Sequence, residues 1–446
     1  MAATGDDAPL TDADGDALFG PLARSGGPAT WVLAVSGGVD STAMLHLAAD
    51  WVRRHPAAGI TLVVATVDHG LRAESATEAA TVASAAEALG LPHVTLPWAG
   101  DKPSTGMQAA ARAARYRLLQ ACAEQPPLQP AYVLTAHTAD DQAETLLMRL
   151  ARGSGVDGLA AMRPRRTLPG SAVVHIRPLL AVRRAQLLAT LVARGLTWID
   201  DPSNQCDRFE RIRIRRLLPQ LAATGLDVTA ISLSAQRLDR ASAALETLTA
   251  RLWDEVADLH QGAYLTMARE AFDAAPAELQ ERLLIRAVTV MGADRGEAGG
   301  IDLAQIEAVV AALAALDRAD LAGRTLHGAL VRATAAKISV FREAGRHGLP
   351  LLILMPGDRA VWDGRFTIAL ATDATGPMLV RSLTAAEWSD LRRRLGRSPP
   401  LPAVAARTLP SFWRGADLIA VPWFGAVSDA LHPDSRHCRA VPITRL

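Results

Sequence analysis

The sequence predicts an α/β protein with an N-terminal parallel sheet that carries helices on both faces, then a mostly helical middle domain and a small α+β C-terminal domain. Three observations predict this. Short apolar runs alternate with amphipathic helical patterns between residues 31 and 176, which is typical of βαβ units in a parallel sheet. A turn with two adjacent glycines follows the first apolar run. After Pro219, long helical stretches replace the alternation.

Each element is predicted from its own stretch of sequence. Short apolar, β-prone runs place strands at residues 31–35, 61–67, 93–97, 132–135 and 173–176. Helical periodicity places helices at residues 42–53, 74–89, 107–123, 140–152, 235–259, 277–291 and 302–315. A hairpin is expected over 326–338, a strand over 366–371 and a helix over 385–395. In a parallel sheet the carboxyl ends of the strands form the edge where ligands bind.

The composition excludes several classes of protein. Hydrophobic residues make up 50% of the chain and charged residues 21%, so the chain can bury large cores and is not disordered as a whole. The three cysteines, Cys122, Cys206 and Cys438, are far apart, which argues against a disulfide framework and against a zinc or iron–sulfur site. There is no apolar run long enough to span a membrane, and the N-terminus is acidic. A cytoplasmic protein is therefore expected.

The net charge of +1 hides a strong segregation along the chain. Residues 1–159 carry −7, residues 160–216 carry +8, residues 217–349 carry −4 and residues 350–446 carry +4. Two basic regions separated by an acidic one indicate an anionic partner that touches the protein at two separate places.

The turn after the first strand has the chemistry of a phosphate site. It consists of Ser36, Gly37, Gly38, Val39, Asp40 and Ser41. Adjacent glycines allow backbone N–H groups to approach a phosphate, and the start of the following helix favours negative charge. Asp40 beside phosphates is repulsive unless a cation bridges them, which points to Mg²⁺. The turn lacks the lysine of the GxxxxGK[ST] loop, so it suits a departing pyrophosphate better. The alternative is an ordinary strand–turn–helix connection.

With Ala34 and Val35 in front of it, this turn resembles the signature of the N-type ATP pyrophosphatases, the PP-loop superfamily. The resemblance implies a sheet domain of the adenine nucleotide alpha hydrolase type that adenylates a carbonyl-type oxygen with ATP. It assigns all six residues from Ser36 to Ser41 to ATP binding. The chemistry of the turn makes Asp40 the candidate Mg²⁺ ligand.

Further motifs indicate the substrate. They are Val67-Asp68-His69-Gly70-Leu71-Arg72, Ala111–Tyr116, Thr135–Thr145, Arg152-Gly153-Ser154-Gly155, Arg177-Pro178-Leu179-Leu180, Asp201-Pro202-Ser203-Asn204 and Arg211–Arg215. In this order they resemble the tRNA(Ile)-lysidine synthetase family, strongly over residues 28–220 and more weakly from Pro356 onwards. The resemblance implies adenylation of the C2 oxygen of cytidine 34 in the CAU anticodon of tRNA(Ile). The ε-amine of free L-lysine then attacks C2, which releases AMP.

Four segments are expected on this basis. Residues 1–27 form an acidic N-terminal extension, 28–220 the PP-loop ATP-binding catalytic domain, 221–345 a mostly helical middle domain, and 349–446 a small α+β domain that binds tRNA.

The candidate site residues carry charges that suit the implied chemistry. The cationic lysine needs carboxylates that bind it and ease the loss of its proton. The catalytic candidates are Asp40, Arg115 and Asp141, and the candidates for binding lysine and cytidine are His69, Arg112, His137, Asp140 and Glu144. Each also has a structural alternative: acidic residues favour helix N-termini, the arginines suit a solvated helix face, and a lone histidine often closes a turn.

The tRNA is expected to contact arginines in both basic regions. The candidates are Arg208, Arg211, Arg213, Arg215, Arg216, Arg392, Arg393 and Arg394. In an extended segment Arg211, Arg213 and Arg215 project to one side, whereas in a helix Arg208, Arg211 and Arg215 do. Ile212 stands where the family usually has asparagine. A solvated basic face is the alternative interpretation.

Other functions remain open from the sequence. A tRNA cytidine thiolase would need cysteine ligands for an iron–sulfur cluster, and an amidotransferase-type synthetase would need a glutaminase motif, which is absent. A non-catalytic tRNA-binding protein on the same scaffold would not need the intact turn. The oligomeric state is left open between a monomer and a homodimer.

Overall fold

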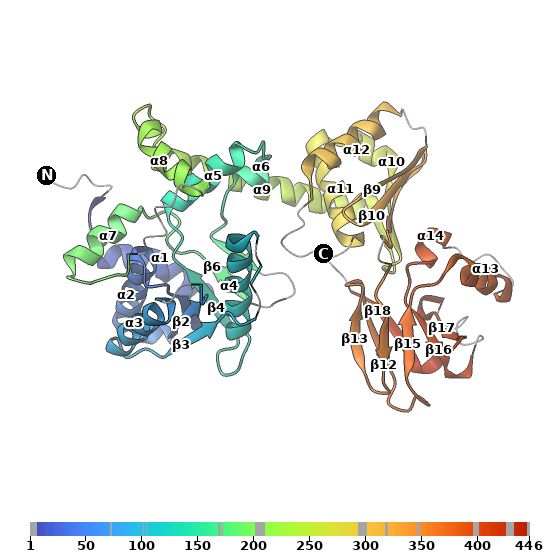
Figure 1. The fold of residues 1–446 in the computed structure, drawn as a ribbon. Coiled ribbons are helices and arrows are strands. Elements are labelled where there is room, and N and C mark those ends of the chain that lie inside the picture. Colours follow the sequence, from blue (N-terminus) through green and yellow to red (C-terminus); the bar gives the residue numbers. More distant parts are fainter. Residues whose placement is uncertain are drawn as a thin grey trace. The chain divides into compact units, whose positions relative to one another are not determined.

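The structure is a computed structural model, and its contacts divide the chain into two compact units, Met1–Ala243 and Ala244–Leu446. Each unit is described by itself (Figure 1). The residues that the structure describes are 7–71, 74–100, 102–103, 105–167, 171, 173–200, 210–292, 301–316, 320–345, 348–395, 401–424 and 432–443.

The first unit alternates strands and helices along most of its length. Its elements are α1 (Asp12–Arg24), β1 (Thr30–Ala34), α2 (Val39–Arg54), β2 (Thr61–Asp68), α3 (Ser75–Ala88), β3 (His93–Pro97), α4 (Met107–Ala123), β4 (Ala131–Thr135), α5 (Ala139–Leu150), α6 (Val156–Leu159), β5 (Arg165–Thr167), β6 (Val174–Ile176), α7 (Arg184–Ala193), α8 (Glu210–Ala222) and most of α9 (Val228–Val256).

The core of this unit is a six-stranded sheet in the order β3-β2-β1-β4-β6-β5. The pairs among β3, β2, β1, β4 and β6 are all parallel. Alternate residues of β1 enter two different cores: Trp31 and Leu33 pack with α2, α3 and α7, while Val32 and Ala34 pack with α4 on the other face. Helices on both faces are therefore confirmed, and β1 lies at the centre of the sheet.

The sequence located β1 to β4, β6 and the helices α2 to α5 within a few residues, but it predicted no helix for α1, α6, α7 or α8, and it placed the start of α9 at residue 235. The sheet also differs in one strand. β5 was not predicted, and it pairs antiparallel with β6 at the edge. Its three residues are all exposed, so no apolar pattern marks it as a strand. The expected boundary at residue 220 falls inside α8, whereas the contacts divide the chain at residue 243, within α9.

The acidic N-terminal stretch contributes to the core of the first unit. Its helix α1 packs on α2, and Phe19 is fully buried with its ring 6.1 Å from that of Trp31 and 6.2 Å from that of Trp51. The acidic residues face outward, where Asp16 accepts a hydrogen bond from Arg54 at 2.9 Å. The described part of the extension expected at residues 1–27, which begins at residue 7, is therefore built into the sheet domain, which its acidic composition did not reveal.

The second unit begins within α9 and contains three sheets. Its further elements are β7 (Ala257–His260), β8 (Tyr264–Ala268), α10 (Arg269–Ala274), α11 (Ala277–Met291), α12 (Leu303–Ala315), β9 (Leu321–Leu326), β10 (Ala329–Ala333), β11 (Lys337–Arg342), β12 (Leu352–Leu354), β13 (Arg359–Trp362), β14 (Phe366–Leu370), β15 (Met378–Arg381), α13 (Ala385–Arg394), α14 (Ala403–Ala406), β16 (Ser411–Arg414), β17 (Asp417–Ala420) and β18 (Cys438–Pro442).

Helices make up the larger part of the middle segment, as predicted, but they pack on a five-stranded antiparallel sheet in the order β7-β8-β11-β10-β9. The hairpin expected over 326–338 corresponds to β10, which pairs with β9 at one edge of this sheet and with β11 at its centre. The C-terminal segment has two small antiparallel sheets, β12-β15-β16-β17 and β13-β14-β18, around one apolar core. The α+β prediction for this segment is confirmed.

A buried ion triad joins the middle sheet to the C-terminal sheets. Asp363 accepts hydrogen bonds from Arg342 at 2.8 Å and from Arg365 at 2.9 Å, and Arg365 also donates to the carbonyl of Gly262 at 3.2 Å. All three ionic side chains are at most 8% exposed, so loss of one partner would leave an uncompensated buried charge.

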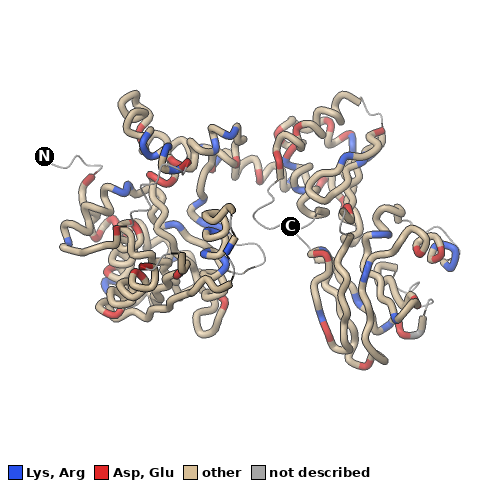
Figure 2. The backbone as a smooth tube through the Cα atoms, in the orientation of Figure 1, with Lys and Arg blue, Asp and Glu red and all other residues tan. Residues whose placement is uncertain are grey.

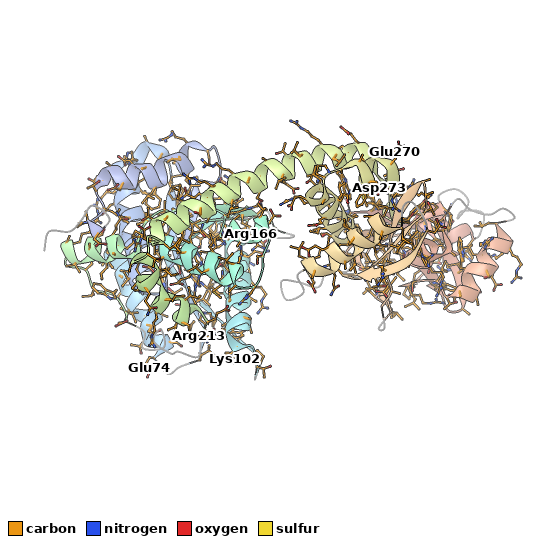
Figure 3. The ribbon with its side chains drawn as sticks, turned by 90° about the horizontal axis from the view of Figure 1, so that it is seen from above. Glu74, Lys102, Arg166, Arg213, Glu270 and Asp273 are labelled. Carbon is orange, nitrogen blue, oxygen red and sulfur yellow. The ribbon has the colours of Figure 1, made fainter. Side chains whose placement is uncertain are left out.

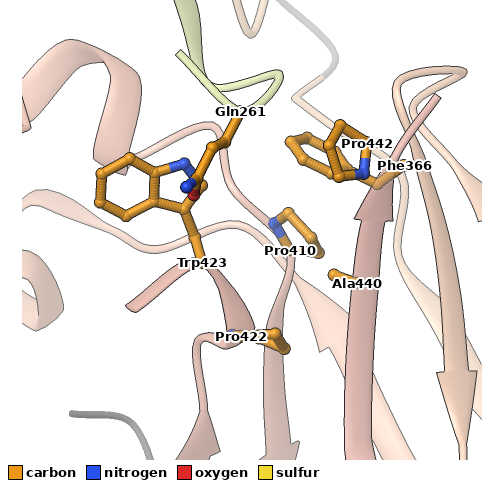
Figure 4. A pocket seen from close by; sticks show the side chains of 7 residues that line it. All are labelled: Gln261, Phe366, Pro410, Pro422, Trp423, Ala440 and Pro442. Atoms are coloured by element: carbon orange, nitrogen blue, oxygen red, sulfur yellow. The ribbon is translucent and has the colours of Figure 1, made fainter. Parts of the chain in front are cut away.

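A small cavity of about 110 Å³ lies in the second unit (Figure 4). Its lining is mainly apolar and consists of Gln261, Phe366, Pro410, Pro422, Trp423, Ala440 and Pro442. Among the residues described, no helix is long and apolar enough to cross a membrane.

The packing of α1 leads to a prediction about stability. Phe19→Ala should lower the free energy of unfolding of the first unit by about 3–5 kcal/mol, because it opens a cavity between two tryptophans. Urea denaturation measures this, with Leu188→Ala as the control, since Leu188 is 39% exposed. A loss in Phe19→Ala no larger than in the control would show that α1 does not stabilise the sheet domain.

Candidate active site

The candidate active site is built around the turn between β1 and α2. Gly37 has a left-handed φ of +84°. The turn is fixed by hydrogen bonds within it: the N–H of Ser36 donates to Oγ of Ser41 at 3.1 Å, and the hydroxyl of Thr42 donates to the carbonyl of Gly37 at 2.9 Å. Gly38 is the N-cap of α2, so the first N–H groups of that helix have no partners within the helix. Such a helix start favours an anion.

The two glycines of the turn have different reasons to be glycine. A Cβ on Gly37 would lie 2.4 Å from Cδ1 of Ile199, whose N–H donates to the Gly37 carbonyl at 2.9 Å. Gly38 has an ordinary φ of −69°, and the nearest protein atom to a Cβ there is Oγ of Ser36, 3.9 Å away. The folded chain therefore explains glycine at 37 but leaves open space in front of Gly38, where a phosphate can approach the backbone.

A cavity of about 530 Å³ opens beside this turn at the carboxyl ends of β1 and β2. It is lined by Ala34, Val35, Ser36, Gly38, Ala65, Thr66, Val67, His69, Leu71, Ser75, Glu78, Ala79, Met107, Gln108, Arg115 and Ile199. The lining is mostly apolar with a few polar groups, which is typical of a site for a small organic molecule. Its position next to the turn suits a nucleotide whose phosphates lie on the turn.

Asp40 stands in the first turn of α2 with only one of its oxygens paired. Oδ2 accepts a hydrogen bond from Arg184 at 3.3 Å, whereas Oδ1 is buried and has no partner among the described residues. Burial raises the pKa of Asp40 to about 6; Arg184 opposes this shift, and the negative charges of Asp141 and Asp140 add to it. A buried carboxylate oxygen without a partner suits a hard cation.

The acidic pair at the start of α5 also has structural roles. Asp141 and Thr138 form a capping box, in which Asp141 Oδ2 accepts from the N–H of Thr138 at 2.9 Å. Asp140 accepts from the N–H of Arg184 at 2.8 Å and from the side chain of Arg183 at 3.3 Å. The alternative interpretation, an acidic helix N-terminus, therefore applies to Asp141, and Asp140 ties α5 to the start of α7.

Glu144 is fully buried and lies between two arginines of α8. Its Oε2 accepts from Nε of Arg211 at 2.8 Å and its Oε1 from Nε of Arg215 at 2.7 Å. Burial raises the pKa of Glu144, while Arg215 and Arg211 act against this shift. The segment is a helix, so the extended strip of Arg211, Arg213 and Arg215 is wrong. The face shared by Arg211 and Arg215 points at Glu144, because a buried carboxylate requires compensating charge.

The remaining tRNA candidates are exposed where the structure describes them. Arg213 and Arg216 lie on the outer side of α8, and Figure 3 shows Arg213 at the edge of the first unit; Figure 2 shows several basic positions along this helix. Arg392, Arg393 and Arg394 are exposed in the last turn of α13, where positive charge also suits the helix dipole. Arg208 lies outside the described residues.

The basic candidates for binding substrate lie in three places: in the cavity wall, on the exposed side of α4 and just after β4. His69 and Arg115 line the cavity, and Nδ1 of His69 is buried without a partner among the described residues. Burial, followed by the charge of Arg115, lowers the pKa of His69. Arg112 is exposed and donates to the hydroxyl of Tyr116 at 3.1 Å. His137 follows β4, with its Nδ1 2.9 Å from Oγ1 of Thr135.

Several residues of the site were not assigned from the sequence. Arg183 and Arg184 pair with Asp140 and Asp40, and Ile199 closes the turn. The two arginines follow the Arg177–Leu180 motif after two intervening residues and could have been noticed there as a basic pair. The contact of Ile199 with Gly37 joins segments more than 150 residues apart, and no local signal reveals it.

Comparison with known proteins gives consistent matches. A family model described as a PP-loop domain matches residues 17–221. The chain is 45% identical over 350 residues to the tRNA(Ile)-lysidine synthase of Bradyrhizobium diazoefficiens, covering 75% of this chain and 95% of that protein. It is 46% identical over 325 residues to that of Rhodopseudomonas palustris, with 71% and 91% coverage. It is 41% identical over 401 residues to that of Ruegeria pomeroyi, with 88% of each chain covered.

The contrast between the two glycines is testable with a matched pair of variants. Gly37→Ala should lose ATP binding and about 1–2 kcal/mol of stability, because it combines strain at positive φ with a collision with Ile199. Gly38→Ala should leave the stability of the protein unchanged. It should nevertheless weaken ATP binding by at least about tenfold, because the new methyl group lies where a phosphate approaches. Thermal unfolding and calorimetric titration measure the two effects. Unchanged ATP affinity in Gly38→Ala would place the phosphates elsewhere.

Proposed function

The chain belongs to the tRNA(Ile)-lysidine synthase family, and we propose that it joins lysine to C2 of cytidine 34 in the CAU anticodon of tRNA(Ile), at the expense of ATP. The observation that carries this proposal is the open turn at Gly38 beside the cavity, next to an oxygen of Asp40 that has no partner among the described residues. The reaction belongs in the cytoplasm, where tRNA, ATP and free lysine occur together.

The first step is adenylation. The C2 oxygen of cytidine attacks the α-phosphorus of ATP, the bond to the β-phosphate breaks, and pyrophosphate leaves. The turn offers backbone N–H groups to the departing pyrophosphate, and Arg115 in the cavity wall supplies positive charge. This activation is required because the oxygen of a ring carbonyl must become a leaving group before an amine can replace it.

Mg²⁺ fits the unpaired oxygen of Asp40. No three histidine, cysteine or acidic side chains gather into a metal cluster within the described part of the chain. Mg²⁺ commonly needs only one or two carboxylates when substrate phosphates and water complete its shell. When bound there, it would neutralise charge on the phosphate oxygens.

In the second step the ε-amine of lysine attacks C2 and AMP leaves. The ammonium form must first lose a proton, and negative charge around the site attracts it and eases that loss. Asp141 and Asp140 lie near enough to Asp40 for their negative charges to raise its pKa. We assign lysine binding to Asp140, beside Asp141, with His69, Arg112 and His137 on the side of the cytidine and the AMP phosphate. Glu144 contributes to the site indirectly, by fixing the positions of Arg211 and Arg215.

The tRNA backbone is assigned to exposed arginines in both units. On α8 these are Arg213 and Arg216, and on α13 they are Arg392, Arg393 and Arg394. They lie in the two segments of net positive charge. Contacts of this kind make binding depend on salt concentration.

The function is tested with ATP, Mg²⁺, labelled lysine and a tRNA(Ile) transcript with a CAU anticodon. We expect label in the tRNA and release of AMP and pyrophosphate. Asp40→Asn should reduce AMP release about 100-fold or more and leave tRNA retention on filters unchanged. Asp50→Asn, further along α2, is the control and should remain active. Release of ADP, or sulfur transfer without lysine, would contradict the proposal.

The division of the arginines on α8 predicts different effects for two neighbouring substitutions. Arg213→Ala should reduce the slope of log affinity for tRNA against log salt by about one and leave stability unchanged. Arg215→Ala should lower the free energy of unfolding by about 1–3 kcal/mol, because it removes a charged hydrogen bond from buried Glu144. Filter binding and urea denaturation measure the two. If Arg213→Ala leaves the salt slope unchanged, Arg213 is not part of the tRNA footprint.

A further inference from the structure

A chain of buried polar side chains leads from β6 to the site through His137. Nη2 of Arg177 lies 3.3 Å from Nδ1 of His175, and Nε2 of His175 lies 2.9 Å from Oγ1 of Thr135. The same Oγ1 lies 2.9 Å from Nδ1 of His137. Thr135 is 0% exposed, His175 1% and Arg177 5%. Because β4 and β6 are neighbours in the sheet, this chain is held by backbone pairing.

The first two hydrogen bonds have only one possible direction. A guanidinium group has donors and no acceptor, so Nδ1 of His175 must accept the hydrogen bond from Arg177. A histidine that accepts at Nδ1 is neutral and carries its proton on Nε2. Nε2 of His175 therefore donates to Oγ1 of Thr135.

The direction at Thr135 sets the state of His137. A threonine hydroxyl has a single proton, and Oγ1 already accepts from His175. The hydroxyl satisfies its own proton by donating it to Nδ1 of His137. If Nδ1 of His137 donated to Oγ1 of Thr135 instead, the hydroxyl proton of the fully buried Thr135 would have no acceptor. Folded proteins avoid such unsatisfied buried donors. Nδ1 of His137 is thus an acceptor, and the neutral ring carries its proton on Nε2.

The surrounding charges act in the same sense on His137. Burial, followed by the positive charges of Arg115, Arg177, Arg112 and Arg211, holds the pKa of His137 well below its ordinary value. These arginines come from α4, from the end of β6 and from α8. An imidazolium at this position would face four guanidinium groups.

His175 is under a similar influence. Burial first, then Arg177, His137, Arg115 and Arg112, lower the pKa of His175 to about 2. The ring edge also packs against the ring of Tyr116, with centroids 5.1 Å apart. Both histidines therefore stay neutral over the range in which the protein works.

We propose that Arg177, His175 and Thr135 are positioning residues that lock His137 as a hydrogen-bond donor at Nε2, so that His137 binds an anionic oxygen of the substrate and does not act as a base. This inference rests on the proposed function, because it names the partner of a residue in that site. The four arginines around His137 favour an oxygen with negative charge. Two substrates offer one: the phosphate that becomes AMP, and the carboxylate of free lysine.

A matched pair of substitutions at His175 tests the relay. In His175→Gln the amide oxygen can accept from Arg177 and the amide nitrogen can donate to Thr135, so the direction of the chain is kept. His175→Leu removes both functions, so the Thr135 hydroxyl is no longer held in the orientation in which it donates to His137. We expect turnover to fall about 10–100-fold in His175→Leu and to change by no more than about threefold in His175→Gln. Equal losses in both variants would overturn the proposal.

The two possible oxygens give different kinetic results in His175→Leu. If His137 donates to the phosphate, ATP–pyrophosphate exchange in the presence of tRNA falls along with turnover. If it donates to the lysine carboxylate, exchange is unchanged and the KM for lysine rises. A variant that alters neither the exchange nor the KM for lysine would contradict a role in binding an anionic oxygen.

The tautomer itself is observable in the full-length protein labelled with ¹⁵N-histidine. The signals of His137 are those lost in His137→Gln. We expect a neutral ring with the proton on Nε2 between about pH 6 and pH 8, the range in which free histidine titrates, and the same in His175→Gln. A proton on Nδ1, or titration within this range, would overturn the relay. This measurement needs neither lysine nor tRNA, so it separates failure of the relay from failure of the proposed function.

A control variant distinguishes the relay from a loss of stability. His260 in the second unit also bonds to a threonine, with its Nε2 2.9 Å from Oγ1 of Thr266. His260→Leu removes a histidine–threonine hydrogen bond that is only partly buried and lies outside the site, and it should keep turnover. If His175→Leu and His260→Leu lose the same activity and the same thermal stability, the effect at His175 is structural and the proposal fails.

Discussion

A turn that binds phosphate must aim several backbone N–H groups at one place and keep side chains out of the way, and this constraint orders the first unit. Gly37 meets it by taking a left-handed conformation, and the side chain of Ile199 packs against its Cα. Gly38 meets it by leaving space in front of the helix. The neighbouring strands β2 and β4 place β1 at the centre of the sheet, so the turn sits where the carboxyl ends of several strands meet.

Most of the charged side chains around this turn form ion pairs with one another, and a few remain available to bind ligands. Glu144 is neutralised by Arg211 and Arg215, which docks α8 on α5. Asp140 binds the start of α7. Asp40 keeps one oxygen without a partner among the described residues, and Arg115 lines the cavity. The Asp40 oxygen and Arg115 thus lie where a metal-bound triphosphate can contact both of them.

The sequence predicted the sheet domain well because its signals are local. The apolar runs of β1, β2 and β4 and the turn at Gly37 and Gly38 are readable from a few neighbouring residues. The sequence left an extended and a helical arrangement of these arginines open, because helix and strand patterns both fit a short charged segment, and the structure shows the helix. The pairing of Glu144 with Arg211 and Arg215 could not be foreseen, since the partners are more than 60 residues apart. The burial of Phe19 was hidden by the acidic residues around it.

The most direct test of this account is an experimental structure of the protein with a non-hydrolysable ATP analogue and Mg²⁺. The account predicts the β- and γ-phosphates on the backbone N–H groups of residues 37–41, the metal on the free oxygen of Asp40, and the adenosine in the cavity beside His69. An analogue bound in another pocket, with this turn empty, would contradict it and remove the basis for the other assignments.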